Sequence, residues 1–285
     1  MLNTGIYYES WAAKWWGSTI GLENMPSNSG AVYLAFCHPF PSGVLGGLEF
    51  MCDITVLKEA IQKAKSRGNT IMLSVGGGLY KFAAVAPHAN YCKVVEFAQS
   101  LGCDGIDIDW EPDVESLGRV PHEQFGPIIA EFRKTGWAGM KLSCAAAPNG
   151  AAEPTNLWRG LNRSGLITHG HMLDWVNIMA YDSGKSYNVF EAFDTFRSIY
   201  KGPLYLGVEL GPQGWGDALT TEQDVLDYHA HISVDPKAGF FVWAYHKEKG
   251  ISPSVERIIA IAESASIDQQ IANLAQSILD LLKQK

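Results

Sequence analysis

Short apolar runs alternate with amphipathic stretches along the chain at a nearly constant interval. Eight runs rich in β-branched and aromatic residues begin at Gly5, Ala31, Thr70, Asp104, Met140, Asp174, Leu204 and Gly239. Successive starts are between 26 residues (Gly5 to Ala31) and 39 residues (Ala31 to Thr70) apart. Short runs of this composition are typical of buried strands in a parallel sheet.

The intervening stretches carry apolar residues every three or four positions, as at Leu57, Ile61 and Ala64, which predicts amphipathic helices. A strand and a helix repeated eight times, with no long linker, predict an α/β fold. We expect a single (β/α)8 TIM barrel over about residues 5–263. A doubly wound open sheet is the alternative, but no G-x-G-x-x-G follows the first predicted strand.

A last amphipathic segment follows the eighth unit. Apolar residues recur at Ile271, Leu274 and Ile278, which predicts a terminal helix over residues 266–285. We expect this helix to close the bottom of the barrel. The alternative is an oligomerisation helix, for which the segment lacks sustained heptads. The chain, residues 1–285, is therefore expected to form one domain and a monomer.

Composition narrows the classes of partner. The chain has 285 residues, of which 22 are Lys or Arg and 30 are Asp or Glu, so the formal net charge is −8. With 47% hydrophobic residues, it is not a disordered chain, and its acidity argues against a nucleic-acid partner. No apolar run approaches the length of a membrane span, so no membrane partner is expected.

The N-terminus enters the first predicted strand at once, which predicts no cleavable signal. Location stays open between the cytoplasm and secretion of a mature form.

Cysteine and aromatic residues give two further expectations. The five cysteines are odd in number and each stands alone in an apolar context. We expect small buried hydrophobic residues in a reducing compartment rather than disulfides or metal ligands. The chain also has 12 Phe, 11 Tyr and nine Trp, and Trp has the flat face best suited to stacking on a sugar ring.

The fourth predicted strand carries a row of acids. It reads DGIDIDWE from Asp104, and strand alternation places Asp107, Asp109 and Glu111 on one face. The apolar residues between them face the surrounding helices: Ile106, Ile108 and Trp110. No Lys or Arg lies nearby in sequence, so a barrel interior that holds this row bears a large cost in desolvation and like-charge repulsion.

Such a row indicates acid–base chemistry. Mutual repulsion raises the pKa of one carboxyl so that it stays protonated near neutral pH, and Glu111 is nearest the mouth where a substrate arrives. The alternatives are a salt-bridged core and a Ca²⁺ or Mg²⁺ site. Ligands in line on one strand surround an ion poorly, so we expect no metal and no cofactor.

The row also resembles a known motif. Asp104 to Glu111 matches in full the D-x-x-D-x-D-x-E signature of family 18 glycoside hydrolases, the chitinases and endo-β-N-acetylglucosaminidases. Residues 74–77 resemble the S-x-G-G of the third strand, residues 179–182 resemble the M-x-Y-D of the sixth, and Trp243 resembles the tryptophan of the eighth. The resemblance covers all eight units and implies a TIM barrel.

The resemblance implies catalytic roles for four residues. Glu111 would protonate the glycosidic oxygen and later serve as base for water, while the substrate's own 2-acetamido group attacks the anomeric carbon. Asp109 would orient that group, with Asp107 sharing a proton behind it. Tyr181 would donate a hydrogen bond to the acetamido oxygen.

The resemblance also implies substrate-binding residues. Trp243 would form an apolar floor under the sugar, and Asp182 would hold a sugar hydroxyl. Met179 alternates with Tyr181 and points into the same interior, where it either fills the barrel, which we favour, or contacts the substrate. Tyr7 and Ser74 would hydrogen-bond the inner aspartates. Tyr8, whose side chain points to the other face of the first strand, is the alternative to Tyr7.

Loop positions complete the expected site. Gly76 and Gly77 allow close backbone approach. The candidate sugar platforms at the mouth are Trp15, Trp16 and Trp215. His38 and Glu209 end their strands as pocket residues without an assigned role. Asn177 departs from the family pattern, which often has Gln at that position.

Three functions are compatible with these motifs. The first is chitinase activity, the endo-hydrolysis of β-1,4 bonds in chitin or N-acetylglucosamine oligosaccharides. The second is endo-β-N-acetylglucosaminidase activity on the chitobiose core of N-glycans, and the third is chitin binding by a non-catalytic lectin. Residues 210–217 lead almost directly into a helix near Thr220, without the module that many chitinases of the family insert there. This short form implies a shallow, open groove and endo action.

Overall fold

A closed barrel of parallel strands forms the centre of the molecule. The computed structural model describes residues 4–11, 21–39, 45–46, 53–78, 90–184, 186–210, 220–245 and 254–264. Its barrel strands are β1 (Thr4–Glu9), β2 (Ala31–Pro39), β4 (Thr70–Gly76), β5 (Gly105–Asp109), β6 (Lys141–Ala146), β7 (Trp175–Ile178), β8 (Leu204–Glu209) and β9 (Ala238–Trp243). The strand order is β1-β9-β8-β7-β6-β5-β4-β2, and pairing of β1 with β2 closes the barrel. The predicted TIM barrel is confirmed.

One further strand lies outside the predicted set. The two-residue β3 (Leu45–Gly46) pairs antiparallel with the end of β2.

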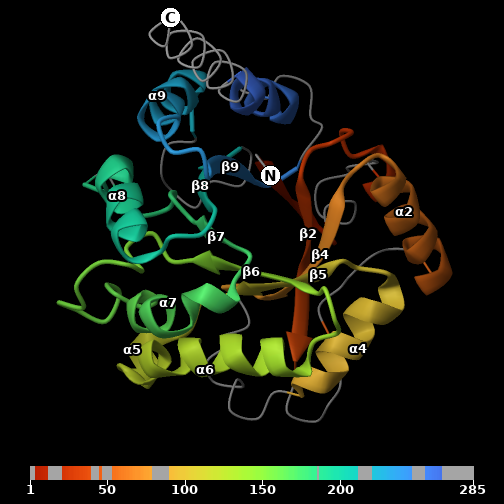
Figure 1. Cartoon of the computed structure of the whole chain (residues 1–285), viewed down its shortest axis with the longest axis horizontal. Helices are drawn as coiled ribbons and strands as arrows, with labels where there is room; N and C mark the ends of the chain where they lie inside the picture. Colours follow the sequence, from red (N-terminus) through yellow and green to blue (C-terminus); the bar gives the residue numbers. More distant parts are fainter. Residues whose placement is uncertain are drawn as a thin grey trace, which may run out of the picture.

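Helices surround the barrel (Figure 1). They are α2 (Ile54–Ser66), α4 (Tyr91–Leu101), α5 (Val114–Leu117), α6 (Val120–Thr135), α7 (Arg163–His169), α8 (Val189–Ile199) and α9 (Glu222–Ile232), with residues 255–264 also helical. Side chains that accept backbone N–H groups fix several helix starts: Asp53, Asn90, Asn188 and Thr221. Within the described segments, no helix combines the length and the apolar character needed to cross a membrane. The predicted terminal helix, residues 266–285, lies outside the described residues.

Strand alternation separates two apolar clusters. One lies inside the barrel and is dominated by aromatic side chains such as Tyr7, Tyr33 and Phe241. The other lies between strands and helices and includes Ile106, Ile108 and Trp110. The alternation predicted for β5 therefore holds, because its apolar residues pack outward and leave the opposite face to the acids.

Ion pairs hold the N-terminal ends of two strands. Asp104 precedes β5, pairs with Lys65 at 2.8 Å, and accepts the Ile71 backbone N–H at 2.9 Å. Asp174 precedes β7 and pairs with Arg133 at 2.9 Å. The negative charge of Asp104, the first acid of the DGIDIDWE run, is thus balanced by Lys65, which is distant in sequence. This ion pair lies at the end of the barrel away from the mouth.

The cysteines follow the predicted burial with one exception. Cys37, Cys103 and Cys144 are buried and free, whereas Cys92 is exposed. The prediction is wrong for Cys92 because the apolar face of α4 lies at other positions, Val94, Val95, Ala98 and Leu101. Cys52 lies outside the described residues.

Packing of α4 on α6 yields a stability prediction. Phe132 on α6 is 0% exposed, and its ring lies edge-on to that of Tyr91 on α4, with 4.9 Å between centroids. Phe132→Ala should lower the free energy of unfolding by about 3–5 kcal/mol, because it removes buried surface and leaves a cavity. Urea unfolding measures this loss.

Ile167→Ala is the control, because Ile167 on α7 is 57% exposed. It should change the free energy of unfolding by no more than about 0.5 kcal/mol. Equal effects of the two substitutions would contradict the assigned packing.

Candidate functional site

A fully buried carboxylate, Asp107 on β5, lies at the base of the site. Ser74 of β4 and Ser143 of β6 are its neighbours in strand register. Their hydroxyls donate to Asp107 at 2.9 Å (Oδ2) and 2.6 Å (Oδ1), and the Tyr7 hydroxyl of β1 donates to Oδ2 at 2.7 Å. Hydrogen bonds to the ionised form offset the cost of burying the carboxylate.

A second set of hydrogen bonds supports Tyr7 from behind. The Asn177 side-chain nitrogen donates to the Tyr7 oxygen at 3.5 Å, and the Tyr33 hydroxyl donates to the Asn177 oxygen at 3.3 Å. The Trp175 indole N–H in turn donates to the Tyr33 oxygen at 2.7 Å. This connected chain orients the Tyr7 hydroxyl toward Asp107.

Asp109, two residues further along β5, has a different environment. It is 3% exposed, and its Oδ1 has no hydrogen-bond partner within the described part of the chain. Burial raises its pKa well above the usual value, and the charges of Glu111 and Asp107 raise it further. Burial also raises the pKa of Asp107, against the lowering effect of its three hydroxyl donors. The row therefore retains protons at pH values where isolated carboxyls are ionised.

Glu111 follows the end of β5 and is only partly exposed. Burial raises its pKa to about 7, against the effect of a hydrogen bond from the Gly78 backbone, and the charge of Asp182 adds to the rise. A carboxyl that titrates near neutral pH, at the open end of the barrel, can both donate and accept a proton there.

Tyr181 and Asp182 follow β7 and lie near these acids. Burial raises the pKa of Tyr181 well above its usual value, as do the charges of Asp109 and Glu111. The phenol therefore keeps its proton as a hydrogen-bond donor. Asp182 is exposed and has a left-handed backbone, with φ of 51°. Met179 is 8% exposed and belongs to the cluster inside the barrel.

An aromatic wall borders the carboxylates. Trp243, partly exposed at the end of β9, stacks on Phe36 with 5.8 Å between ring centroids and 17° between planes. Tyr7 meets the Trp243 ring edge-on at 5.6 Å, and Trp11 lies 6.5 Å away. The peptide bonds Ala35–Phe36 and Trp243–Ala244 are cis. This wall offers a flat apolar surface beside the acids.

Glycine after β4 permits a close approach to this wall. Gly77 has φ of 91°, and a Cβ there would lie 2.8 Å from the Phe36 ring. Its N–H donates to the Asp109 backbone oxygen at 3.2 Å. Gly76 precedes it with φ of 118°. The two glycines thus bring the end of β4 against both β5 and Phe36.

The predicted contacts of Tyr7 and Ser74 with an inner aspartate are confirmed. Both side chains are buried, and both donate to Asp107. Tyr8, the alternative to Tyr7, points to the other face of β1 and packs in the cluster between strands and helices. His38 and Glu209 are buried at the ends of β2 and β8.

Some predicted residues cannot be placed, and others were missed. The expected sugar platforms Trp15, Trp16 and Trp215 lie outside the described residues. Sequence reasoning missed Ser143, whose signal is a hydroxyl at an inward position beside Asp107. It also missed Trp11, which follows β1, and Phe36, which lies where β2 departs from regular register between Leu34 and Cys37.

Among the residues that the structure describes, no group of three or more His, Cys, Asp or Glu side chains is arranged to hold a metal ion. The donor set around Asp107 consists of hydroxyl groups that donate hydrogen bonds, which suits a carboxylate and not a cation.

Comparison with known sequences identifies similar proteins. The family model described as "Glycosyl hydrolases family 18" matches residues 3–255. Chitinase 1 of Aphanocladium album is 27% identical over 156 residues, which are 50% of this chain and 34% of that protein. Endochitinase 1 of Metarhizium anisopliae is 31% identical over 141 residues, or 44% of this chain and 31% of that protein. The matched segments thus span about a third of these relatives.

Comparison with solved structures extends over nearly the whole chain. A GH18 chitinase from Pseudoalteromonas aurantia has a TM-score of 0.72 at 19% identity, covering 92% of this chain and 99% of that one. A fungal family 18 endo-β-N-acetylglucosaminidase has a TM-score of 0.61 at 15% identity, covering 93% and 97%. These likenesses establish the barrel fold.

The environment of Glu111 yields a titration prediction. Its side-chain carboxyl should titrate near pH 7, and Asp182→Asn should lower that midpoint because it removes a nearby negative charge. Carbon-13 NMR of labelled glutamate follows the titration, with Glu111→Gln used to assign the signal.

Asp227→Asn, an exposed position on α9, is the control and should leave the midpoint unchanged. A Glu111 midpoint near 4.5 in the unsubstituted protein would contradict the assigned environment.

Proposed function

Since the chain belongs to glycosyl hydrolase family 18, we propose that it is a chitinase that cleaves internal β-1,4 bonds between N-acetylglucosamine residues. One observation carries the proposal: the row of acids runs from a buried, triply hydrogen-bonded Asp107, through Asp109, to Glu111, whose pKa burial raises to about 7. Its partners are chitin and N-acetylglucosamine oligosaccharides.

Glu111 acts first as general acid. Its protonated carboxyl donates to the glycosidic oxygen as the bond from that oxygen to the anomeric carbon breaks, so the leaving sugar departs as a neutral alcohol. A pKa of about 7 favours this role because a large fraction of the carboxyl is protonated near neutral pH. The proton would be lost above that range.

The substrate supplies the nucleophile. Asp109 ends β5 and Glu111 lies two residues beyond it, so both approach the sugar from the same side and neither is placed to attack the opposite face of the ring. The oxygen of the substrate's 2-acetamido group attacks the anomeric carbon instead and forms an oxazolinium ion. Asp109 accepts the acetamido N–H and stabilises the positive charge, and the Tyr181 hydroxyl donates to the acetamido oxygen as the group is positioned.

Water completes the reaction. Glu111, now ionised, takes a proton from a water molecule as the water oxygen bonds to the anomeric carbon and the oxazolinium ring opens. Glu111 is protonated again, and two displacements give net retention of configuration. Asp107 shares a proton with Asp109 during the cycle, and the Trp243 face supports the sugar ring. No metal or cofactor takes part in these steps.

The general acid yields the first activity prediction. Glu111→Gln should reduce release of N-acetylglucosamine oligomers from the hexamer by about 10²–10⁴-fold, because it removes the proton donor. Binding of the hexamer, followed by calorimetry, should be retained because the substitution preserves the shape of the side chain.

Glu115→Gln is the matched control, since Glu115 is an exposed residue on α5. It should leave both cleavage and binding unchanged. If the unsubstituted protein binds the hexamer yet leaves it intact through long incubation, the protein is a chitin-binding lectin and the proposal fails.

A paired digestion separates the two hydrolytic candidates. The core of an N-glycan contains the same N-acetylglucosamine linkage, and a fungal endo-β-N-acetylglucosaminidase shares this fold. We expect chitohexaose to be shortened while a high-mannose glycoprotein keeps its glycans, as measured by mass spectrometry. Deglycosylation of the protein with chitohexaose intact would assign the second activity.

A further inference from the structure

Tyr33 lies on β2 inside the barrel, where complete burial keeps it out of contact with a substrate. Its side chain is 0% exposed, and its ring stacks on that of Tyr7, with 4.4 Å between centroids and 20° between planes. Among the described residues, its hydroxyl bonds to Trp175 and Asn177 and to no carboxyl group. Any effect of this neutral phenol on the row of acids therefore passes through its hydrogen-bonded neighbours.

The hydrogen-bond chain from Trp175 to Asp107 can run in only one direction. An indole N–H donates and cannot accept, so the 2.7 Å contact from Trp175 uses a lone pair of the Tyr33 oxygen. The single proton of the Tyr33 phenol is then donated to the Asn177 oxygen, at 3.3 Å. This contact turns the Asn177 nitrogen toward Tyr7, at 3.5 Å, and an amide nitrogen donates. The Tyr7 hydroxyl is left with Asp107 as the acceptor for its own proton, at 2.7 Å.

The Tyr33 hydroxyl is the group that fixes the direction of the Asn177 amide. The two ends of a side-chain amide have nearly the same shape, but the oxygen accepts and the nitrogen donates. Without the Tyr33 hydroxyl, the Asn177 amide can turn over and present its oxygen to Tyr7. That oxygen then competes with Asp107 for the Tyr7 proton.

The donor from Tyr7 is one of three that keep Asp107 ionised. Ser74 and Ser143 supply the other two, and hydrogen bonds to the ionised form lower the pKa of a carboxyl. Asp109 has no comparable set, since its Oδ1 has no hydrogen-bond partner among the residues described. A proton shared by the two aspartates therefore rests on Asp109 while Asp107 has all three donors, and moves toward Asp107 when one donor is withdrawn.

Other titratable groups face these acids from the neighbouring strands. The neutral ones keep their protons because burial raises the pKa of each above its usual value: Tyr7, Tyr33, Cys144, Tyr181 and Tyr205. Two further carboxyls contribute charge, Asp182 acting on Glu111 and Glu209 acting on Tyr181. In the described segments, no Lys or Arg offsets the charge of the row. The proton of the inner pair is therefore distributed between Asp107 and Asp109 by their hydrogen bonds.

We infer that Tyr33 is a positioning residue that acts through Asn177 and Tyr7. It holds Asp107 ionised and leaves the shared proton on Asp109, beside Glu111. The inference rests on the proposed function for the role of Glu111 as general acid. A neutral Asp109 places no charge beside Glu111, whereas an ionised Asp109 opposes loss of the Glu111 proton. Tyr33 thus sets the pH at which Glu111 changes from acid to base, without touching the substrate.

Tyr33→Phe tests this role because it removes the hydroxyl and keeps the stacked ring. The Glu111 midpoint in the carbon-13 NMR titration should rise by about one pH unit, since Asp109 becomes ionised beside it. The basic limb of the kcat/KM profile on chitohexaose should move up by the same amount. KM should stay unchanged because Tyr33 does not contact the substrate.

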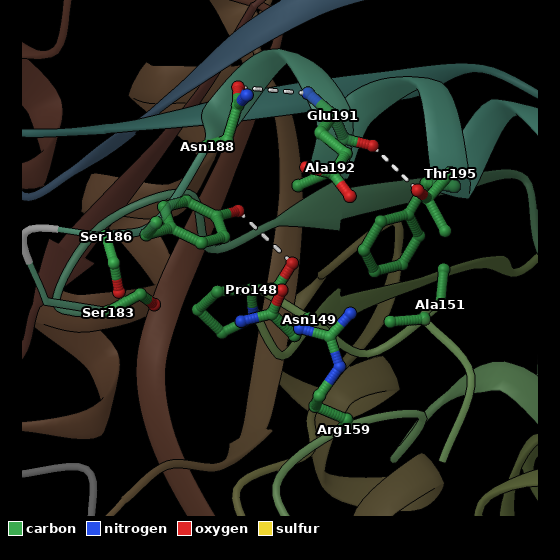
Figure 2. A pocket seen from close by; sticks show the side chains of 13 residues that line it. Pro148, Asn149, Ala151, Arg159, Ser183, Ser186, Asn188, Glu191, Ala192 and Thr195 are labelled. Atoms are coloured by element: carbon green, nitrogen blue, oxygen red, sulfur yellow. Dashed lines mark hydrogen bonds between the residues drawn. The ribbon is translucent and has the colours of Figure 1, made fainter. Parts of the chain in front are cut away.

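Two control variants should leave the midpoint and the basic limb unchanged. Tyr205→Phe is the matched control, since Tyr205 is an inward tyrosine on β8, is 1% exposed and is not part of the chain from Trp175 to Asp107. Glu191→Gln controls for a change of charge elsewhere. Glu191 is an exposed residue on α8 that lines a pocket opposite Arg159 (Figure 2).

The same substitution in a Tyr7→Phe background tests the route. Tyr7→Phe should itself raise the Glu111 midpoint, because it removes a donor to Asp107. Tyr33→Phe should then add nothing, since two residues that act through one contact are not additive. A further rise of equal size would mean that Tyr33 acts by another route and would overturn the inference.

The NMR readout separates this inference from the proposed function. A rise of the midpoint in Tyr33→Phe supports control of Glu111 by Tyr33 even if the unsubstituted protein cleaves nothing and the proposed function fails. Cleavage of chitohexaose, with the midpoint and the basic limb unchanged in Tyr33→Phe, overturns the inference and leaves the proposed function standing.

A measurement on the unsubstituted protein decides the matter if Tyr33→Phe does not fold. Carbon-13 NMR of labelled aspartate, with Asp109→Asn used for assignment, should give Asp109 a higher midpoint than Asp107. The reverse order overturns the inference.

Discussion

The burial of one carboxylate, Asp107, constrains much of the barrel. An ionised carboxylate in an apolar interior is stable only with hydrogen-bond donors, and three hydroxyls supply them from β1, β4 and β6. Ser74 and Ser143 can reach it only because their strands are in register with β5. Tyr7 reaches it from β1, held by the Asn177, Tyr33 and Trp175 chain. The site and the strand register therefore depend on the same contacts.

From Asp107 to Glu111 the acids pass from the buried interior of the barrel to its solvent-exposed mouth. Asp107 has its donors, Asp109 is buried with one oxygen unpaired among the described residues, and Glu111 lies at the mouth with a pKa of about 7. Like charges at this spacing cannot all be ionised at low cost, so protons are retained where a substrate can use them. Trp243, stacked on Phe36, adds a flat surface beside these acids. The arrangement is the one that the proposed reaction on an N-acetylglucosamine unit uses.

Periodicity was sufficient to predict the strands and the direction of the acids. The eight predicted strand starts agree with the observed strand starts to within one residue. A buried parallel strand is a nearly continuous run of apolar residues, so it can be located from the sequence alone. Alternation alone placed Asp107 and Asp109 inward. It could not identify Ser143 as a donor or Asn177 as a link to Tyr7, because these contacts depend on register and on distances across the barrel. Phe36 was missed because β2 departs from regular register between Leu34 and Cys37. Cys92 was predicted buried from its neighbours, although the helix turns it outward.

The anomeric form of the first product tests the account most directly. In the proposed reaction the acetamido group and then water displace at the same carbon, so configuration is retained. Proton NMR of chitohexaose during early turnover should show new reducing ends as the β-anomer, with the α-anomer appearing later by mutarotation. An initial α-anomer would mean a single displacement by water and would contradict the assignment of Asp109 and Glu111.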